Sequence, residues 1–463
     1  MRYIYLVLIA FFINSCAAPY TSEEIAQDFQ INDFRNTYDL TNAQTDSIFD
    51  VFNDEELKNL ITIALKQNSD IFIYDSRIKT AASQVKIATS KLMPNIDGSV
   101  SYQFNKDSTI DTNLMASWEL DIFGKYASSK NAYEEMFEIA KQNLDFFKIS
   151  LISDVSLAYF NIKYLQSNII LTKERIKNYY DLLEVMNIMY ENGFVDFSEF
   201  LENKALLQNE EQTLNNLLNE YEVQKNELRV LINDKDYRFD DSIYHFTIPR
   251  FRVNLSNSVE IILNRPDIKA QISNLNAAVY NLNSAKASLY PTISLSGSLG
   301  KTLLSPNGVG DLAYQILTSL TLPIFSRMEI YENIKISDYT RIESYYTLQK
   351  AIYTALSEIE NAIYAMQTNQ KTLSTSIEML EENEEILDML KESNELGLID
   401  FIEYITALNS NLLMMQNNNI SYFNTISATI YLYRSIGGNR NDIAIAQNAI
   451  NTEDSIKQDS TEK

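Results

Sequence analysis

Apolar residues recur at every seventh position over a long segment in the second half of the chain. This repeat consists of Ile352, Ile359, Met366, Leu373, Leu380 and Leu387, with Leu356, Ile363 and Ile377 four residues after members of it. Such spacing is typical of a coiled-coil seam. It predicts one helix from Arg327 to about Leu396, roughly 100 Å long at 1.5 Å per residue. Residues 125 to 192 are predicted to form a second helix of similar length.

Four shorter segments alternate apolar and small polar residues, which indicates β-strands with two different faces. We expect strands at about 95–104, 113–123, 292–300 and 315–325. Pro94 and Pro291 stand directly before the first and third of them and are predicted to mark helix-to-strand junctions. These lengths are near those of tilted strands that cross a bilayer. Alternation alone fits equally a pair of hairpins half-buried on a soluble core.

Matching segments in the two halves predict an internal duplication. "LMP" at 92–94 corresponds to "LYP" at 289–291, and "ENGFVDFSEF" at 191–200 corresponds to "ELGLIDFIEY" at 395–404. The first repeat is expected at 54–233 and the second at 257–438, with 234–256 as a linker. Each repeat is predicted to run helix, strand, strand, very long helix, turn, helix. The fold class is therefore mainly α with a β portion.

The last two helices of each repeat are predicted to form an antiparallel hairpin with a glycine at its tip. Gly193 and Gly397 follow the long helices at the position of a C-terminal glycine cap. Asp196 and Asp400 come three residues later, where an acidic residue suits the start of the returning helix.

The chain begins with features of an exported lipoprotein. Residues 1–15 carry Arg2 and an apolar run too short to span a bilayer, which predicts a signal peptide. Small residues then surround Cys16, as in a bacterial lipobox, so Cys16 is expected to carry palmitate or other acyl chains. A plain secretory signal is the alternative. We expect 16–53 to be a polar arm and 439–463 a polar tail.

Composition narrows the possible functions. With 38 basic and 62 acidic residues the formal charge is −24, which disfavours nucleic acid as a partner. One Cys and one His supply neither a cysteine-based metal site nor histidine-dependent catalysis. No phosphate-binding loop, nucleophile elbow or HExxH motif occurs. We expect no catalytic residue, no metal, no cofactor and no enzyme.

Four strands cannot close a membrane barrel, which needs about eight or more. Open strand edges in hydrocarbon would leave backbone groups unpaired at several kcal/mol each. If these strands enter a membrane, several chains must therefore share one barrel.

Two long segments resemble the outer membrane efflux proteins, the TolC-like channel-tunnels, and most closely their OprM-like and NodT lipoprotein branch. They are "ASWELDIFGKYASSKNAYE" (116–134) and "NRPDIKAQISNLNAAVYNLNSAKASLYPTISLSGSLG" (264–300). The resemblance implies a homotrimer in which each chain gives four strands to a twelve-stranded barrel and its helices to a periplasmic tunnel. It implies a lipid-anchored protein of the cell outer membrane, in contact with outer membrane lipid.

The resemblance also implies a passive exit duct for multidrug efflux. Its partners would be a periplasmic adaptor (membrane fusion) protein and an inner-membrane pump of the resistance-nodulation-division type. The family places acidic residues at the tunnel mouth, where this chain has Glu403 and, in place of a second acid, Thr406. The first repeat has acids at three matching positions, Asp196, Glu199 and Glu202. With Asp400 and Glu403 they are the candidates for a cation-selective ring, although helix capping also explains Asp196 and Asp400.

Other functions stay open. The same fold could serve type I protein secretion or metal efflux, because the partner selects the cargo. A structural periplasmic coiled-coil lipoprotein without a pore is an alternative of another class. Formation of a closed barrel would exclude it.

Overall fold

The computed structural model describes residues 18–29, 34, 46–104, 108–239, 246–249, 251–252, 258–305, 308–439 and 442. The predicted signal peptide, Cys16 and most of the predicted C-terminal tail lie outside these residues. The helices are α2 (Ser22–Asp28), α3 (Ile48–Phe52), α4 (Glu55–Gln67), α5 (Ser69–Ser90), α6 (Lys125–Glu191), α7 (Phe197–Ile232), α8 (Ser258–Asn264), α9 (Pro266–Ala287), α10 (Arg327–Glu395) and α11 (Phe401–Ser435). The strands are β1 (Asn95–Gln103), β2 (Thr109–Leu120), β3 (Thr292–Leu304) and β4 (Ala313–Thr321).

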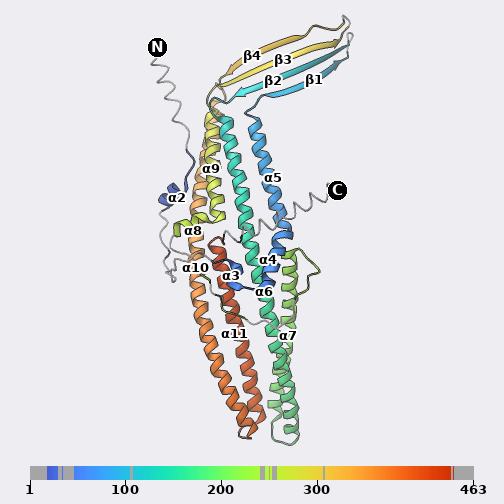
Figure 1. The fold of residues 1–463 in the computed structure, drawn as a ribbon, viewed down its shortest axis with the longest axis vertical. Coiled ribbons are helices and arrows are strands. Elements are labelled where there is room, and N and C mark those ends of the chain that lie inside the picture. The colour runs from blue at the N-terminus through green and yellow to red at the C-terminus, as the bar shows by residue number, and fades with distance from the viewer. Residues whose placement is uncertain are drawn as a thin grey trace. The chain divides into compact units, whose positions relative to one another are not determined.

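The order of elements repeats, so the predicted mainly α fold with a duplicated unit is confirmed. The first copy runs α5, β1, β2, α6, α7, and the second runs α9, β3, β4, α10, α11 (Figure 1). The long helices have 67 residues in α6 and 69 in α10. No helix within the described ranges combines the length and apolarity that a membrane crossing would require.

The described residues divide into two compact units. The first takes those within Met1–Ile31, Ile73–Leu144 and Leu263–Thr354 and includes the sheet. The second takes those within Asn32–Phe72, Asp145–Ile262 and Ala355–Lys463 and includes both hairpin tips.

The four strands form one antiparallel sheet in the order β1-β2-β3-β4. Its pairing places Ile96 beside Ala116, Ala116 beside Gly297 and Gly297 beside Ile316, which makes one face apolar. Many of these apolar side chains are exposed. Among the described residues, the outer strands β1 and β4 each pair on one side only, which leaves two open edges on the sheet.

The strand ends differ from the expected ones for local reasons. β2 begins at Thr109 rather than 113 and stops at Leu120 rather than 123. It stops because the Asp121 carboxylate accepts hydrogen bonds from the N–H groups of Tyr126 and Ala127, at 3.0 and 2.7 Å, and so caps α6. β4 ends at Thr321, two residues before Pro323, which has no N–H to donate.

The heptad seam of α10 is buried along its first part. Ile352, Ile359, Met366 and Leu373 are almost fully covered, whereas Leu380 and Leu387 are half-buried. The matching part of α6 is buried as well, at Val155, Ile162 and Ile169 among others. The two long helices therefore share one burial pattern, displaced by 204 residues, up to the point where α10 becomes exposed.

Candidate functional site

Both hairpin tips are built from the same turn. Gly193 and Gly397 have φ of 79° and 71°, in the left-handed region that favours glycine. The N–H of Phe194 donates to the Met189 carbonyl and that of Leu398 to the Ser393 carbonyl, each at 2.9 Å. These bonds satisfy carbonyls that a helix end leaves unpaired.

The aspartates that begin the returning helices behave differently in the two tips. The Asp400 carboxylate accepts a hydrogen bond from the Glu403 N–H at 2.8 Å and caps α11. Asp196 occupies the same position before α7, but its side chain makes no capping hydrogen bond. The sequence alone gave no reason to separate them.

The candidate acids of the tunnel mouth lie in the first turns of the returning helices. Glu199 and Glu202 are on α7 and Glu403 is on α11, and all three are exposed. Thr406 is exposed too, and its hydroxyl donates to the Ile402 carbonyl of its own helix at 2.8 Å. These side chains thus project from neighbouring turns of two equivalent helix ends.

A small apolar cluster holds the two hairpins together near their tips. Leu182 and Met186 of α6 pack against Ile405 of α11, and all three are almost fully buried. Residues around it include Val195, Phe200 and Phe401. The turns that carry the acids are therefore fixed by packing between the two repeats.

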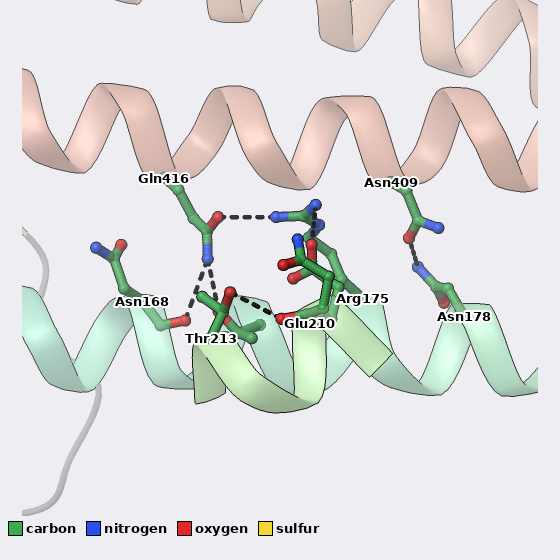
Figure 2. A network of polar contacts seen from close by, with 9 residues as sticks. Asn168, Arg175, Asn178, Glu210, Thr213, Asn409 and Gln416 are labelled. Carbon is green, nitrogen blue, oxygen red and sulfur yellow. Dashed lines mark hydrogen bonds and ion pairs between the residues drawn. The ribbon is translucent and has the colours of Figure 1, made fainter. Parts of the chain in front are cut away.

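Farther from the tips, a buried polar network joins α6, α7 and α11 (Figure 2). Arg175 of α6 pairs with Glu210 of α7, with 2.6 Å between Nη2 and Oε1, and both side chains are about nine-tenths buried. Arg175 Nη1 also donates to Gln416 Oε1 of α11 at 3.1 Å. Gln416 Nε2 in turn donates to Thr172 Oγ1 at 2.8 Å and to the Asn168 carbonyl at 3.3 Å.

The ion pair of this network is largely removed from solvent. Burial raises the pKa of the Glu210 carboxyl, and the positive charge of Arg175 offsets part of that rise. Among the described residues, neither Arg175 Nε nor Glu210 Oε2 has a hydrogen-bond partner. The pair therefore depends on its single short contact and on Gln416. Sequence reasoning missed it, because its members lie 35 positions apart with no motif between them.

The two predicted junctions precede strands in the same way. Pro94 lies between α5 and β1, and Pro291 lies between α9 and β3. The Trp118 indole of β2 donates to the Leu92 carbonyl at 3.0 Å, and the rings of Phe123 and Tyr290 stack at 4.7 Å. Aromatic and backbone contacts thus fasten both turns to the start of the sheet.

Among the described residues, no three His, Cys, Asp or Glu side chains are placed so that they could hold a metal ion.

The arrangement of duplicated hairpins and one antiparallel sheet is similar to the fold of solved outer membrane channels. The Campylobacter jejuni CmeC outer membrane channel is similar at a TM-score of 0.76 and 22% identity, over 92% of this chain and 94% of that one. The family model described as "Outer membrane efflux protein" matches residues 60–234 and 257–438. The chain belongs to this family, so the resemblance seen in the sequence is confirmed.

Two curated relatives span most of the chain. "Toxin and drug export protein A" of Aggregatibacter actinomycetemcomitans is 26% identical over 84% of this chain and 87% of its own length. "Nodulation protein T" of Rhizobium leguminosarum bv. viciae is 24% identical over 78% and 77%. Both therefore align with the repeats as a whole rather than with one motif.

Proposed function

We propose that this chain is the outer membrane channel of a tripartite efflux system. It is a passive exit duct through which small molecules leave after an inner-membrane pump has delivered them by way of a periplasmic adaptor. The pump supplies the energy, so the chain needs no catalytic residue and is not an enzyme. Family membership is the first support for this function.

The open sheet is the observation that carries the proposal. In the part of the chain that the structure describes, four antiparallel strands leave two unpaired edges, β1 and β4, and bear exposed apolar side chains such as Val100 and Ile316. In a bilayer each unpaired backbone group would cost several kcal/mol, so the edges must pair with other strands. Three copies would give twelve strands, enough to close a barrel. Two copies would also reach about eight strands, so the number three rests on the resemblance to the channel-tunnels, and on that basis we assign a homotrimer in the outer membrane.

The hairpin tips form the periplasmic mouth in this proposal. Glu199, Glu202 and Glu403 would each appear three times around the opening. Their carboxylates would attract cations and repel anions. Asp196 stands beside them with a side chain that caps nothing, whereas Asp400 is engaged with its own helix.

A lipid on Cys16 would anchor the chain to the membrane surface beside the barrel. The apolar run before Cys16 and the small residues around it support this assignment. Intact-protein mass spectrometry of the membrane form tests it: a mass increase of acyl chains on the fragment that begins at Cys16 is expected, and an unmodified Cys16 would contradict it.

The cargo is proposed as small molecules and drugs. The word "drug" in the name of the first relative supports this, while "toxin" in the same name favours protein secretion as the second candidate. Loss of the gene should make cells more sensitive to several unrelated small compounds. Loss of one secreted protein without drug sensitivity would favour the secretion duct, and sensitivity to metal ions alone would favour metal efflux.

The mass of the complex is the decisive test. The complex would be extracted from outer membranes in mild detergent and measured by light scattering corrected for detergent. Three times the mass of one chain is expected, together with ion conductance in planar bilayers. A monomer, with no oligomer after cross-linking in intact membranes, would overturn the channel and leave the structural lipoprotein.

A further inference from the structure

In the first hairpin, side chains of α11 cover the surface of α6 beside its ion pair with α7, and we call this surface the first groove. Gln416 reaches into it and contacts Asn168, Thr172 and Arg175, as described above (Figure 2). Asn419 Nδ2, one turn along α11, donates to Ser167 Oγ at 2.9 Å. A helix of the second repeat therefore closes the groove of the first repeat through two amide side chains.

The second hairpin has the same groove between α10 and α11, and there it is open. A pocket of about 410 Å³ lies between these helices, lined among others by Lys371, Thr372, Ser376, Met379 and Met414. An offset of 204 relates these five positions to Ser167, Asn168, Thr172, Arg175 and Glu210 of the filled groove. The pocket is thus the counterpart of the site that Gln416 occupies.

The offset of 204 is supported by structure as well as by sequence. It relates Glu191 to Glu395 at the ends of α6 and α10, and Phe197 to Phe401 at the starts of α7 and α11. It also relates three buried pairs of the long helices: Val155 with Ile359, Ile162 with Met366 and Ile169 with Leu373. The register is therefore constant through the groove.

The same offset identifies the counterparts of the two amides that fill the first groove. Gln416 corresponds to Gln212 and Asn419 corresponds to Asn215, so both residue types are the same. Gln212 and Asn215 lie on α7 and are exposed. The chain thus has an open groove on one hairpin and an unused pair of matching amides on the other.

The apolar contacts of the seam show the same contrast. Leu182 and Met186 are 1% and 0% exposed because Ile405 of α11 covers them. Their counterparts are Ile386, which is 53% exposed, and the half-buried Leu390. The counterpart of Ile405 is Leu201 on α7, which is 45% exposed. The residues that match this apolar cluster therefore lie at least partly exposed on two different helices, with Ile386 and Leu390 on α10 and Leu201 on α7.

We infer that the groove between α10 and α11 is the docking site for α7 of a second copy of this chain. This inference rests on the homotrimer proposed above and specifies its seam. In it, Gln212 and Asn215 of one copy enter the groove at Thr372 and Ser376 of the next, and Leu201 covers Ile386 and Leu390. Within one chain, α11 covers α6. If neighbouring copies repeat this contact at the equivalent helices, α7 of the next copy lies on α10. Such a contact is head-to-tail, and it can close into a ring.

The chemistry of the open groove suits these side chains. Ser376 Oγ donates to Asn418 Oδ1 at 3.1 Å and keeps lone pairs that can accept from the Gln212 amide, as Thr172 accepts from Gln416. Lys371 is an exposed donor that can reach an amide oxygen of Gln212 or Asn215. Met379 and Met414 replace the ion pair with flexible apolar surface, which can adapt to an incoming helix.

Paired cysteines test this seam in the membrane-bound protein. Cys16 is the only native cysteine, so Gln212→Cys with Ser376→Cys adds the only other thiols. A short homobifunctional thiol cross-linker should then give products of two and three chains on a denaturing gel. The matched pair Thr172→Cys with Gln416→Cys, at the equivalent positions within one chain, should lose its free thiols and give only a cross-linked single chain.

The controls separate this inference from the channel itself. Glu222→Cys with Ser376→Cys should give no cross-linked product of two or three chains. Residue 222 lies ten positions after residue 212 on α7, about 15 Å along the helix and on another face. A complex of trimer mass in which Gln212→Cys and Ser376→Cys do not cross-link, while the matched pair within the chain does, would overturn the seam and leave the trimer. A monomer in membranes would overturn both.

Discussion

The two hairpins share a backbone plan but differ in what covers them. The first groove is covered by α11 and holds a buried ion pair, Arg175 with Glu210. The groove of α10 and α11 is open and has Met379 and Met414 at the same positions. A buried ion pair needs fixed partners, whereas methionine tolerates an adaptable contact. The inferred seam explains this difference: the first groove is covered from within the same chain, and the second would be covered by another copy.

The largest expected effect comes from breaking the ion pair of the first hairpin. Arg175→Met leaves the Glu210 carboxylate buried without its counter-charge, which should lower the free energy of unfolding by about 3–5 kcal/mol. Arg175→Met with Glu210→Met installs the methionine pair of the second hairpin and should recover more than half of that loss. Chemical unfolding of the detergent-solubilised protein, followed by circular dichroism, measures both.

The second hairpin supplies the control for that experiment. Met379→Leu exchanges one apolar side chain for another of similar size, and should cost less than about 1.5 kcal/mol. If the double methionine variant were no more stable than Arg175→Met, the loss would come from packing around residue 175 rather than from an unpaired charge.

The cost of removing Arg175 should depend on pH. Burial already raises the pKa of Glu210 above its ordinary value of 4.5, and Arg175 counteracts this, so the pKa should rise further in Arg175→Met. When folding raises the pKa of a carboxyl, the folded protein loses stability as the pH increases through that raised pKa. The gap between Arg175→Met and the parent should therefore be wider at pH 8 than at pH 5, by about 1.4 kcal/mol for each further unit of pKa. A gap independent of pH would contradict an ionised, unpaired Glu210.

Sequence patterns predicted the features that depend on local chemistry. Gly193 and Gly397 were found because a left-handed helix end requires glycine, and Pro94 and Pro291 because proline interrupts a helix. Because the chain is duplicated, a feature predicted in one half could be compared with the matching position of the other half. The family followed from the two long matching segments, and the family model confirms it.

Features that depend on contacts between distant helices could not be predicted. The contact of Gln416 with Thr172 joins residues 244 positions apart, and nothing near either residue indicates the other. The end of β2 depends on whether Asp121 continues the strand or caps α6, and both are compatible with its type. Asp196 and Asp400 match in sequence, yet only Asp400 caps its helix.

Substitutions of the two tip aspartates also test the difference between the two hairpins, and their effects on stability should be smaller. Asp400→Ala removes a capping hydrogen bond and should cost about 1 kcal/mol locally, whereas Asp196→Ala removes none and should cost a few tenths. Hydrogen exchange read by mass spectrometry should show the first turn of α11 exchanging about fivefold faster in Asp400→Ala, with little change at α7 in Asp196→Ala. Equal acceleration in both would mean that the two aspartates act through charge at the helix start.

The smallest expected effects concern the proposed mouth. Glu199→Gln and Glu403→Gln each remove three exposed carboxylates from a trimer, so each should lower the cation-to-anion permeability ratio in planar bilayers by about twofold at low salt. The effect should shrink near 1 M salt, where the screening length falls to about 3 Å. Thr406→Glu adds an acid at the position that matches Glu202 and should raise the ratio. Glu222→Gln, on α7 but about 35 Å from the turn, should leave it unchanged. A ratio that responds to Glu222→Gln as strongly as to the tip variants would mean that overall charge, rather than the two rings of tip acids, selects the ions.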